Sequence, residues 1–381
     1  MIPYGRQEIT KRDVDAVTQV LQSDFLTQGP LVPKFEKLVA GYCGSKHGVA
    51  TNSATSALHI ACLALGLKKN DYLWTSPISF VASANCALYC GAKVDFVDID
   101  LETYNLSPEA LEEKLIQAQK NNKLPKVLVP VHFGGQSCEM EKIYQLGQKY
   151  GFKIIEDASH AIGGKYKNKP IGSCDFSDIT VFSFHPVKII TTAEGGMAVT
   201  NNKELAQKMF LLRSHGITRD SNLMTNEPDG EWYYQQIELG FNYRMNDIQG
   251  ALGVSQMNSL DEYIQKRQDI AKRYIEELNG QPVKWQLQSR NKHSAYHLFV
   301  VRVKASEHKK IFNQLKNNSI GVNLHYIPIY RQPYYERYGF IRRDYPNSEK
   351  YYSQAITIPI YPGLGKIDQN KIISTLKLLI N

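Results

Sequence analysis

The sequence predicts an α/β protein with a mainly parallel sheet and a smaller α+β domain at its C-terminal end. Over roughly the first two thirds of the 381 residues, short apolar runs alternate with segments of helical periodicity, which is the pattern of a parallel sheet covered by helices on both faces. From about residue 246 the pattern changes to a long helical stretch followed by a second set of strands and helices. We therefore expect a large domain over residues 1–245, and a linking helix with a small domain over residues 246–381.

The elements of the large domain follow from local patterns. Residues 10–21 carry apolar side chains at helical spacing, and Thr10 and Asp13 have the spacing of a capping box. A second helix is expected over residues 35–42, before Gly44. A short apolar strand at 48–50 runs into the hydroxyl-rich segment 52–56, and residues 57–67 have the composition of a buried helix. Further strands are expected at 72–75, 93–97, 127–131, 152–155, 179–184 and 197–200, and further helices near 81–88, 107–119 and 140–150.

The C-terminal third has a different pattern of predicted helices and strands. Residues 246–279 continue one helical pattern, which includes Ile248, Leu252 and Met257. After it we expect a strand over 296–303, a helix over 307–317, a strand near 322–326 and a terminal helix over 369–380.

Composition limits the class of protein. Lys and Arg number 45 against 37 Asp and Glu, a net charge of +8, but these charges are interspersed rather than gathered in one stripe, so we expect no nucleic-acid partner. No run reaches the ~18 apolar residues of a membrane-spanning helix, and the N-terminus does not read as a secretory leader. The six cysteines form no C-x-x-C pair, which favours buried free thiols in a reducing compartment. We expect a cytoplasmic protein without a membrane partner.

Several common catalytic motifs are absent. The sequence has no G-x-G-x-x-G after a strand, no G-x-x-x-x-G-K-[ST], no G-x-S-x-G and no H-E-x-x-H. The commonest dinucleotide, nucleoside triphosphate, hydrolase and zinc-protease sites of α/β proteins are therefore unsupported.

Three segments follow strands of the predicted sheet, where parallel sheets bind their ligands. Residues 52–57 combine small side chains, hydroxyls and a helix start, which suits a phosphate but also fits an ordinary capped helix. Asp157 ends one strand and either faces a ligand or caps a turn. Lys188 follows another strand and precedes a Gly-Gly pair, so it either forms a Schiff base or is a solvated loop lysine.

Two further segments have competing interpretations. Asp98 and Asp100 form a D-x-D after a strand, as in many metal-dependent glycosyltransferases, but the pattern is short and a polar strand exit is the simpler interpretation. The aromatic run 232–234 either lines a sugar pocket or lies at a dimer interface. We expect no metal site.

Taken together, the first three segments fit one cofactor. Pyridoxal phosphate needs a phosphate cradle, an acid at its pyridine nitrogen, an aromatic side chain over its ring and a lysine on its aldehyde. The chain offers residues 53–56, Asp157, Phe80 and Lys188 for these four roles. The carboxylate would keep the pyridine nitrogen protonated, which makes the ring an electron sink.

On these motifs the sequence resembles the DegT/DnrJ/EryC1/StrS family of sugar aminotransferases, which are pyridoxal-phosphate-dependent enzymes of fold type I, the aspartate aminotransferase-like fold. The resemblance covers nearly the whole chain and is greatest to the branch that acts in pseudaminic acid biosynthesis. It is carried by residues 26–30, 52–58, 76–82, 156–160, 182–185, 190–196, 213–216, 240–244 and 325–328.

The resemblance implies roles for individual residues. Lys188 falls at the family's Schiff-base lysine, Asp157 at the pyridine-nitrogen acid and Phe80 at the ring-stacking position. Asn242 falls at a residue that reaches the phosphate from the partner subunit, which implies a homodimer with shared active sites. The phosphate cradle falls on Ala54, Thr55 and Ser183, and the substrate-binding positions fall on Tyr4, Asp24, Phe25, Leu26, Thr27, Asn323, Leu324, His325 and Tyr326.

The implied reaction moves an amino group from L-glutamate to C4 of a UDP-4-keto-6-deoxy-N-acetylhexosamine, within that branch UDP-2-acetamido-2,6-dideoxy-β-L-arabino-hex-4-ulose. Lys188 would move the protons, and since relatives that dehydrate sugars have histidine there, the lysine favours transamination. The alternatives are an aminotransferase for a nucleotide-4-keto sugar of different stereochemistry, a cofactor-binding protein without turnover, and a metal-dependent glycosyltransferase acting through Asp98 and Asp100.

Overall fold

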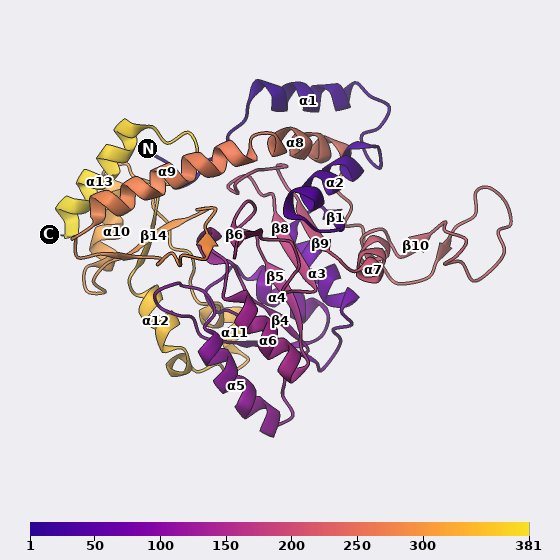
Figure 1. Ribbon diagram of the computed structural model, residues 1–381, viewed down its shortest axis with the longest axis horizontal. Coiled ribbons are helices and arrows are strands. Elements are labelled where there is room, and N and C mark those ends of the chain that lie inside the picture. The colour runs from indigo at the N-terminus through magenta and orange to yellow at the C-terminus, as the bar shows by residue number, and fades with distance from the viewer. Residues whose placement is uncertain (381) are drawn as a thin grey trace.

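The computed structural model describes residues 1–380 and is built on one seven-stranded sheet (Figure 1). The strand order is β1-β9-β8-β5-β4-β2-β3. β9 is antiparallel to both of its neighbours, whereas the pairings from β8 through β5, β4 and β2 to β3 are all parallel, so the expected mainly parallel sheet is confirmed. The strands are β1 (His47–Thr51), β2 (Tyr72–Thr75), β3 (Lys93–Phe96), β4 (Val127–Val129), β5 (Lys153–Asp157), β8 (Ile179–Ser183) and β9 (Gly196–Thr200).

Helices cover both faces of this sheet. One face packs against α3 (Ala54–Ala64), α4 (Ala82–Tyr89) and α7 (Lys203–Arg213), and the other against α2 (Leu31–Cys43), α5 (Pro108–Lys120) and α6 (Met140–Tyr150). Because side chains alternate along a strand, Val127 and Val129 enter the core on the α3 side while Leu128 enters the core under α5 and α6. Burial on both faces is the reason that a central strand such as β4, with the sequence Val-Leu-Val, is apolar throughout.

Local sequence sets the helix ends. The capping box expected at Thr10 and Asp13 starts α1 (Lys11–Leu21). Gly44, with φ of 77°, ends α2 in the left-handed conformation that glycine adopts without strain. The helix α3 begins at Ala54, three residues earlier than expected, because the Ser53 side chain accepts the backbone N–H of Ser56 and caps it.

The single long helix expected over 246–279 is divided in two. α8 (Asp247–Met257) packs against α1 and α2, and the second half of α9 (Leu260–Leu278) enters a separate core. Between them, the Asn258 side chain donates to the backbone carbonyls of Val254 and Ser255 and so satisfies the end of α8. The helical periodicity of the sequence continues across this break, which is why the pattern alone did not reveal it.

The second core is built on a three-stranded antiparallel sheet of β12 (Lys284–Trp285), β14 (Phe299–Arg302) and β15 (Ala355–Ile358). α9, α10 (His308–Asn317) and α13 (Lys366–Ile380) pack on it, and Ile2 joins from the N-terminus. The strand expected near 322–326 is not formed, since only Asn323 bridges Thr357. The division of the chain between residues 245 and 246 stays a prediction.

The remaining elements are short, and the sequence did not predict them. It also did not predict α7, the helix described above. A hairpin of β10 (Ile217–Thr218) and β11 (Gln235–Gln236) projects from the body, at the right of Figure 1. None of the helices within residues 1–380 has the length and apolar character that a bilayer span requires. The other short elements are β6 (Lys165–Tyr166), β7 (Lys169–Pro170), β13 (Lys292–His293), α11 (Pro333–Glu336), α12 (Pro346–Tyr352) and the 3-10 turns Phe133–Gly135, Ile329–Arg331 and Arg342–Asp344.

Candidate active site

A cavity of about 540 Å³ opens at the carboxyl ends of β1, β5 and β8, the edge at which the sequence predicted chemistry. Its walls come from the large sheet, from Tyr4 near the N-terminus and from the segment 323–326 beside the second core. Eleven of the residues predicted for cofactor or substrate line it: Tyr4, Ala54, Thr55, Phe80, Asp157, Ser183, Lys188, Asn323, Leu324, His325 and Tyr326.

The acid of the cavity is Asp157, the last residue of β5. It is only 4% exposed, and Ser83 donates its hydroxyl to Oδ2 at 2.6 Å. The backbone N–H of Ser159 donates to Oδ1 at 3.1 Å. Ser83 is itself held by Ser79 at 2.7 Å between the two hydroxyl oxygens. These hydrogen bonds fix the direction in which the carboxylate points.

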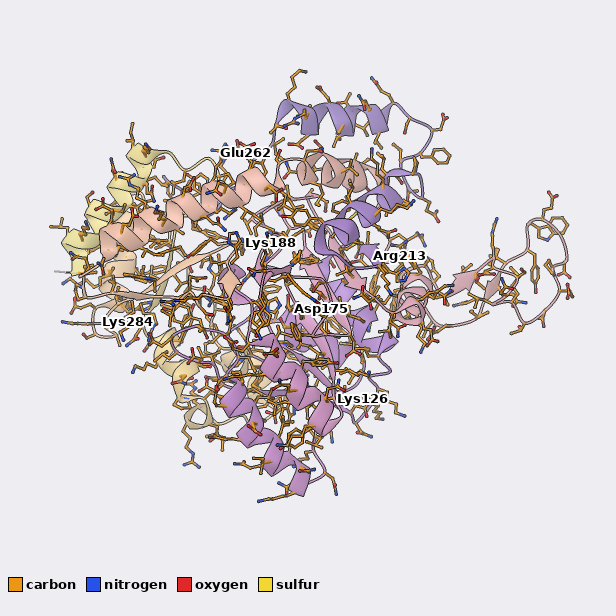
Figure 2. All side chains as sticks on the ribbon, viewed as in Figure 1. Lys126, Asp175, Lys188, Arg213, Glu262 and Lys284 are labelled. Carbon is orange, nitrogen blue, oxygen red and sulfur yellow. The ribbon has the colours of Figure 1, made fainter. Side chains whose placement is uncertain are left out.

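The amine of the cavity is Lys188, in the loop between β8 and β9 and near the centre of the molecule (Figure 2). Burial lowers the pKa of this lysine to about 8, while the negative charge of Asp157 acts in the opposite direction. Within residues 1–380, Lys188 makes no salt bridge. At neutral pH the uncharged fraction of this amine is therefore much larger than for an ordinary lysine, and the uncharged amine can act as a nucleophile or base.

The turn from β1 into α3 has the form of an anion cradle. Ala54 and Thr55 open α3, and the first N–H groups of a helix have no acceptor within the helix. Ser183, at the end of β8, lines the same end of the cavity. Gly196 lies directly beneath the turn: a Cβ there would be 2.4 Å from the backbone nitrogen of Ala54. The backbone of β9 at Gly196 therefore packs directly against the backbone of the turn at residues 53–54, with no room for a side chain between them.

An aromatic wall completes the cavity. Phe80 is 59% exposed, unusually open for a phenylalanine, and its ring centroid is 6.3 Å from that of Tyr326. An open aromatic face beside an acid and a lysine is a suitable surface for a flat heteroaromatic ring.

Three residues that shape the site, Ser83, His160 and His297, are not among the predicted site residues. His160 Nε2 is 3.1 Å from the Tyr326 hydroxyl, and the His160 and His297 ring centroids are 4.5 Å apart. Burial holds the pKa of both histidines well below the usual range, so both rings are neutral. His160 lies in the segment 156–160 that carries the family resemblance. Nothing local marks Ser83, which contacts Asp157 from behind the cavity lining, or His297, which the fold brings into that lining.

Five predicted residues do not line the cavity of this chain. Asn242 is exposed, and its backbone carbonyl accepts from the Asn52 side chain at 3.5 Å, next to the cradle. The segment Asp24, Phe25, Leu26 and Thr27 lies between α1 and α2, where the Leu26 carbonyl accepts the N–H of Asp247. Their predicted roles stay predictions. Among the aromatic run 232–234, Trp232 is 73% exposed and none of the three lines the cavity.

The D-x-D pair is structural. Asp98 accepts the backbone N–H groups of Asn347 and Ser348, both at 2.9 Å, and so caps α12. Asp100 accepts from Thr103 within its own turn. No cluster of three metal-ligating side chains occurs among the described residues. The glycosyltransferase alternative therefore loses the only observation that supported it.

Comparisons with known proteins agree with this geometry. The pattern of the DegT/DnrJ/EryC1/StrS aminotransferase family matches residues 7–377. The UDP-4-amino-4,6-dideoxy-N-acetyl-beta-L-altrosamine transaminase of Campylobacter jejuni is 39% identical over 381 residues, 99% of this chain and 96% of that protein. Helicobacter pylori PseC, an aminotransferase involved in the biosynthesis of pseudoaminic acid, superposes with a TM-score of 0.90 at 31% identity, covering 100% of this chain and 99% of that one. The PLP form of Spr1654 from Streptococcus pneumoniae superposes with a TM-score of 0.89 at 27% identity, covering 99% and 98%.

The residues present fit pyridoxal phosphate. The same cavity is lined by a carboxylate that hydrogen bonds fix, by a lysine without an ion pair, by the exposed ring of Phe80 and by the N-terminus of α3, which suits a phosphate. The expected fold type, cofactor and enzyme class are confirmed. The chain belongs to the DegT/DnrJ/EryC1/StrS aminotransferase family and is a pyridoxal-phosphate-dependent sugar aminotransferase.

Proposed function

We propose that this aminotransferase moves an amino group from L-glutamate to C4 of a UDP-4-keto-6-deoxy-N-acetylhexosamine, namely UDP-2-acetamido-2,6-dideoxy-β-L-arabino-hex-4-ulose, in pseudaminic acid biosynthesis. The observation that carries the proposal is that one cavity contains Lys188, Asp157 and, from distant parts of the chain, Tyr4 and the segment 323–326, which the family resemblance assigns to substrate. The names of the Campylobacter jejuni relative and of Helicobacter pylori PseC support this choice of sugar.

The cofactor, when bound, supplies an electron sink that takes up the donor's amino group and passes it to the sugar. In the proposed arrangement Asp157 holds a proton at the pyridine nitrogen, because its carboxylate is already fixed by Ser83. The first N–H groups of α3 and the Ser183 hydroxyl bind the phosphate, and Phe80 lies against the ring.

Lys188 moves the protons of both half-reactions. Its Nζ takes a proton from Cα of the donor and gives one to C4 of the sugar. Because its pKa of about 8 lies near neutral pH, the amine can both accept and release a proton. Tyr4 and the segment 323–326, which line the same cavity, bind the sugar nucleotide.

We further propose a homodimer with shared active sites in the cytoplasm. Asn242 is exposed beside the cradle. Trp232 on the projecting hairpin and Leu239 just after it are exposed apolar side chains, which suit burial against a second copy. All six cysteines are free thiols, as a reducing compartment would keep them.

The test follows the visible absorption of the purified protein through each half-reaction. Wild type should be yellow from cofactor held by Lys188, should bleach with L-glutamate, and should regain its colour when the UDP-4-keto sugar is added. Lys188→Ala should lack that band, whereas Lys203→Ala, which removes an exposed lysine, should behave as wild type. NMR of the product then gives the configuration at C4.

Two results would contradict the proposal. A protein that stays colourless after pyridoxal phosphate is supplied cannot use Lys188 as described. A protein that bleaches with glutamate but aminates only a 4-keto sugar of another configuration would support the alternative assignment within the same family.

A further inference from the structure

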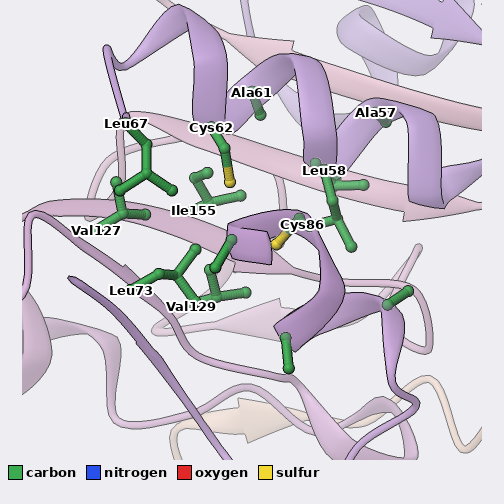
Figure 3. Packing of buried hydrophobic residues seen from close by; sticks show 14 of the residues in the cluster. Ala57, Leu58, Ala61, Cys62, Leu67, Leu73, Cys86, Val127, Val129 and Ile155 are labelled. Carbon is green, nitrogen blue, oxygen red and sulfur yellow. The ribbon is translucent and has the colours of Figure 1, made fainter. Parts of the chain in front are cut away.

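A second cavity, of about 250 Å³, lies at the edge of the second core and shares no lining residue with the cavity of the active site. Figure 2 shows one of its residues, Lys284, at the left of the molecule, whereas Lys188 is near the centre. The core under α3 is filled by apolar side chains such as Leu73, Val129 and Ile155 (Figure 3), but most of the residues that line this second cavity are charged.

The buried anchor of the second cavity is Arg302, the last residue of β14, which is only 4% exposed. Its Nε donates to the Tyr104 hydroxyl at 3.2 Å, its Nη1 to Oε1 of Gln354 at 3.2 Å and its Nη2 to Oε1 of Glu102 at 3.4 Å. Gln354 and Glu102 line the same cavity, so the two terminal nitrogens of Arg302 lie at its wall. A guanidinium has five N–H groups. One N–H on each terminal nitrogen is therefore left without an acceptor within residues 1–380.

The rest of the lining adds positive charge. Lys284, Lys304 and Lys350 contribute three ammonium side chains, and neither Lys304 nor Lys350 makes a salt bridge within residues 1–380. Glu102 is the one carboxylate among the described lining residues, and its contacts to Arg302 and Lys284, at 3.4 and 4.0 Å, are long for ion pairs. Four cations against one carboxylate leave this cavity with a formal charge of +3.

This combination suits the oxygens of a phosphate group. The planar fork of a buried guanidinium binds phosphate oxygens in a fixed direction, and ammonium groups at the rim add charge without demanding one geometry. No aromatic side chain lines the cavity in the part of the chain that the structure describes, so it offers no stacking surface for a nucleobase. We propose that this cavity is a phosphate-binding site, separate from the cofactor cradle, for inorganic phosphate or the phosphate group of a small metabolite.

Arg302 also supports the substrate wall of the active site. Tyr104, which accepts from its Nε, is buried, and its ring centroid is 4.8 Å from that of Tyr351. The Tyr351 hydroxyl donates to the backbone carbonyl of His325 at 2.6 Å, and His325 lines the active-site cavity. Removal of Arg302 would therefore disturb two sites at once, so the variants that test the proposal are made at the rim. The inference does not depend on which sugar the enzyme aminates.

The test is isothermal titration calorimetry of the holoenzyme in a phosphate-free buffer of low ionic strength. The holoenzyme is used because the bound cofactor already occupies the cradle with its own phosphate. Inorganic phosphate should bind saturably, pyrophosphate should bind more tightly because it carries more charge, and added sodium chloride should weaken both by screening. Binding of glycerol 3-phosphate as well would support a metabolite as the ligand, whereas binding of inorganic phosphate without it would support the free ion.

Substitutions at the rim locate the bound phosphate. Lys304→Gln and Lys350→Gln should each weaken phosphate binding about threefold to tenfold, because each removes one charge from the lining. Glu102→Gln should instead tighten it by a similar factor, since it removes the repelling carboxylate, and a folding defect cannot produce that result. The matched control is Lys309→Gln, which removes an exposed lysine of α10 outside the cavity and should bind phosphate as wild type does.

The proposal would be overturned if the holoenzyme bound no phosphate saturably, or if its affinity were the same in wild type and in the three rim variants, since the phosphate would then lie elsewhere. Bleaching of the cofactor by L-glutamate, followed in the same preparations, should be unchanged in all four variants. A failure of the phosphate site is thereby kept separate from a failure of the proposed transamination.

Discussion

The contact between Gly196 and the phosphate cradle leads to a quantitative prediction. A Cβ added at Gly196 would lie 2.4 Å from the backbone nitrogen of Ala54 and 2.5 Å from the carbonyl carbon and oxygen of Ser53. Ordinary contact begins at 3.4 Å, so the turn must retreat by about 1 Å. All three atoms in conflict belong to the backbone, and Gly196 is itself fixed between Thr51 on β1 and Ser183 on β8, so neither side can yield by rotating a side chain.

In Gly196→Ala the N–H groups at the start of α3 should therefore no longer point at the phosphate. Hydrogen bonds to a charged group are worth about 1.5–3 kcal/mol each, so the loss of one such bond weakens cofactor binding by about 10- to 100-fold. The assay is titration of the cofactor-free protein with pyridoxal phosphate, followed by absorbance, after far-UV circular dichroism has shown that the variant is folded.

The matched control is Gly41→Ala. Gly41 lies within α2 and a Cβ there meets nothing within 4 Å, so this variant should bind the cofactor as wild type does and should be slightly more stable. A folded Gly196→Ala protein with wild-type cofactor affinity would refute the reasoning, because it would mean that the cradle does not depend on the close approach of β9.

Three further predictions concern the site and the core. The rate at which pyridoxal phosphate joins Lys188 in cofactor-free protein should rise with pH and reach half its maximum near pH 8, because burial lowers the pKa of this lysine; stopped-flow absorbance measures it, and a midpoint near 10.5 would contradict it. Ser83→Ala should weaken cofactor binding severalfold, since the variant loses the 2.6 Å hydrogen bond that fixes Asp157, and a titration with unchanged affinity would count against this role. Glu36→Ala should lower the free energy of unfolding by about 3–5 kcal/mol in urea denaturation, because the largely buried charge of Arg213 loses its ion-pair partner and keeps only the Ala50 carbonyl.

The Glu36 prediction has its own control. Glu109→Ala removes an exposed salt bridge to Lys142 and should barely change stability. Equal effects of the two variants would mean that the buried pair contributes no more than a surface pair.

The sequence by itself determined the alternation of strands and helices, the capping box of α1 and the chemistry carried by Asp157, Lys188 and the residues after β1. These features are local, because caps, apolar periodicity and the residue types that a cofactor needs all depend on short stretches of sequence. The same local signals also placed the candidate residues at strand ends, which a parallel sheet brings to one edge.

Only the tertiary structure decided which side chains support those residues. Ser83 reaches Asp157 across 74 positions and His160 reaches Tyr326 across 166, and no periodicity encodes such distances. Asp98 shows the reverse case. It has the sequence context of a metal ligand, yet its carboxylate accepts the backbone N–H of Asn347 at the start of α12, 249 residues later. The physical reason is the same throughout, since hydrogen bonds, burial and close backbone approach are set by which elements the fold makes neighbours.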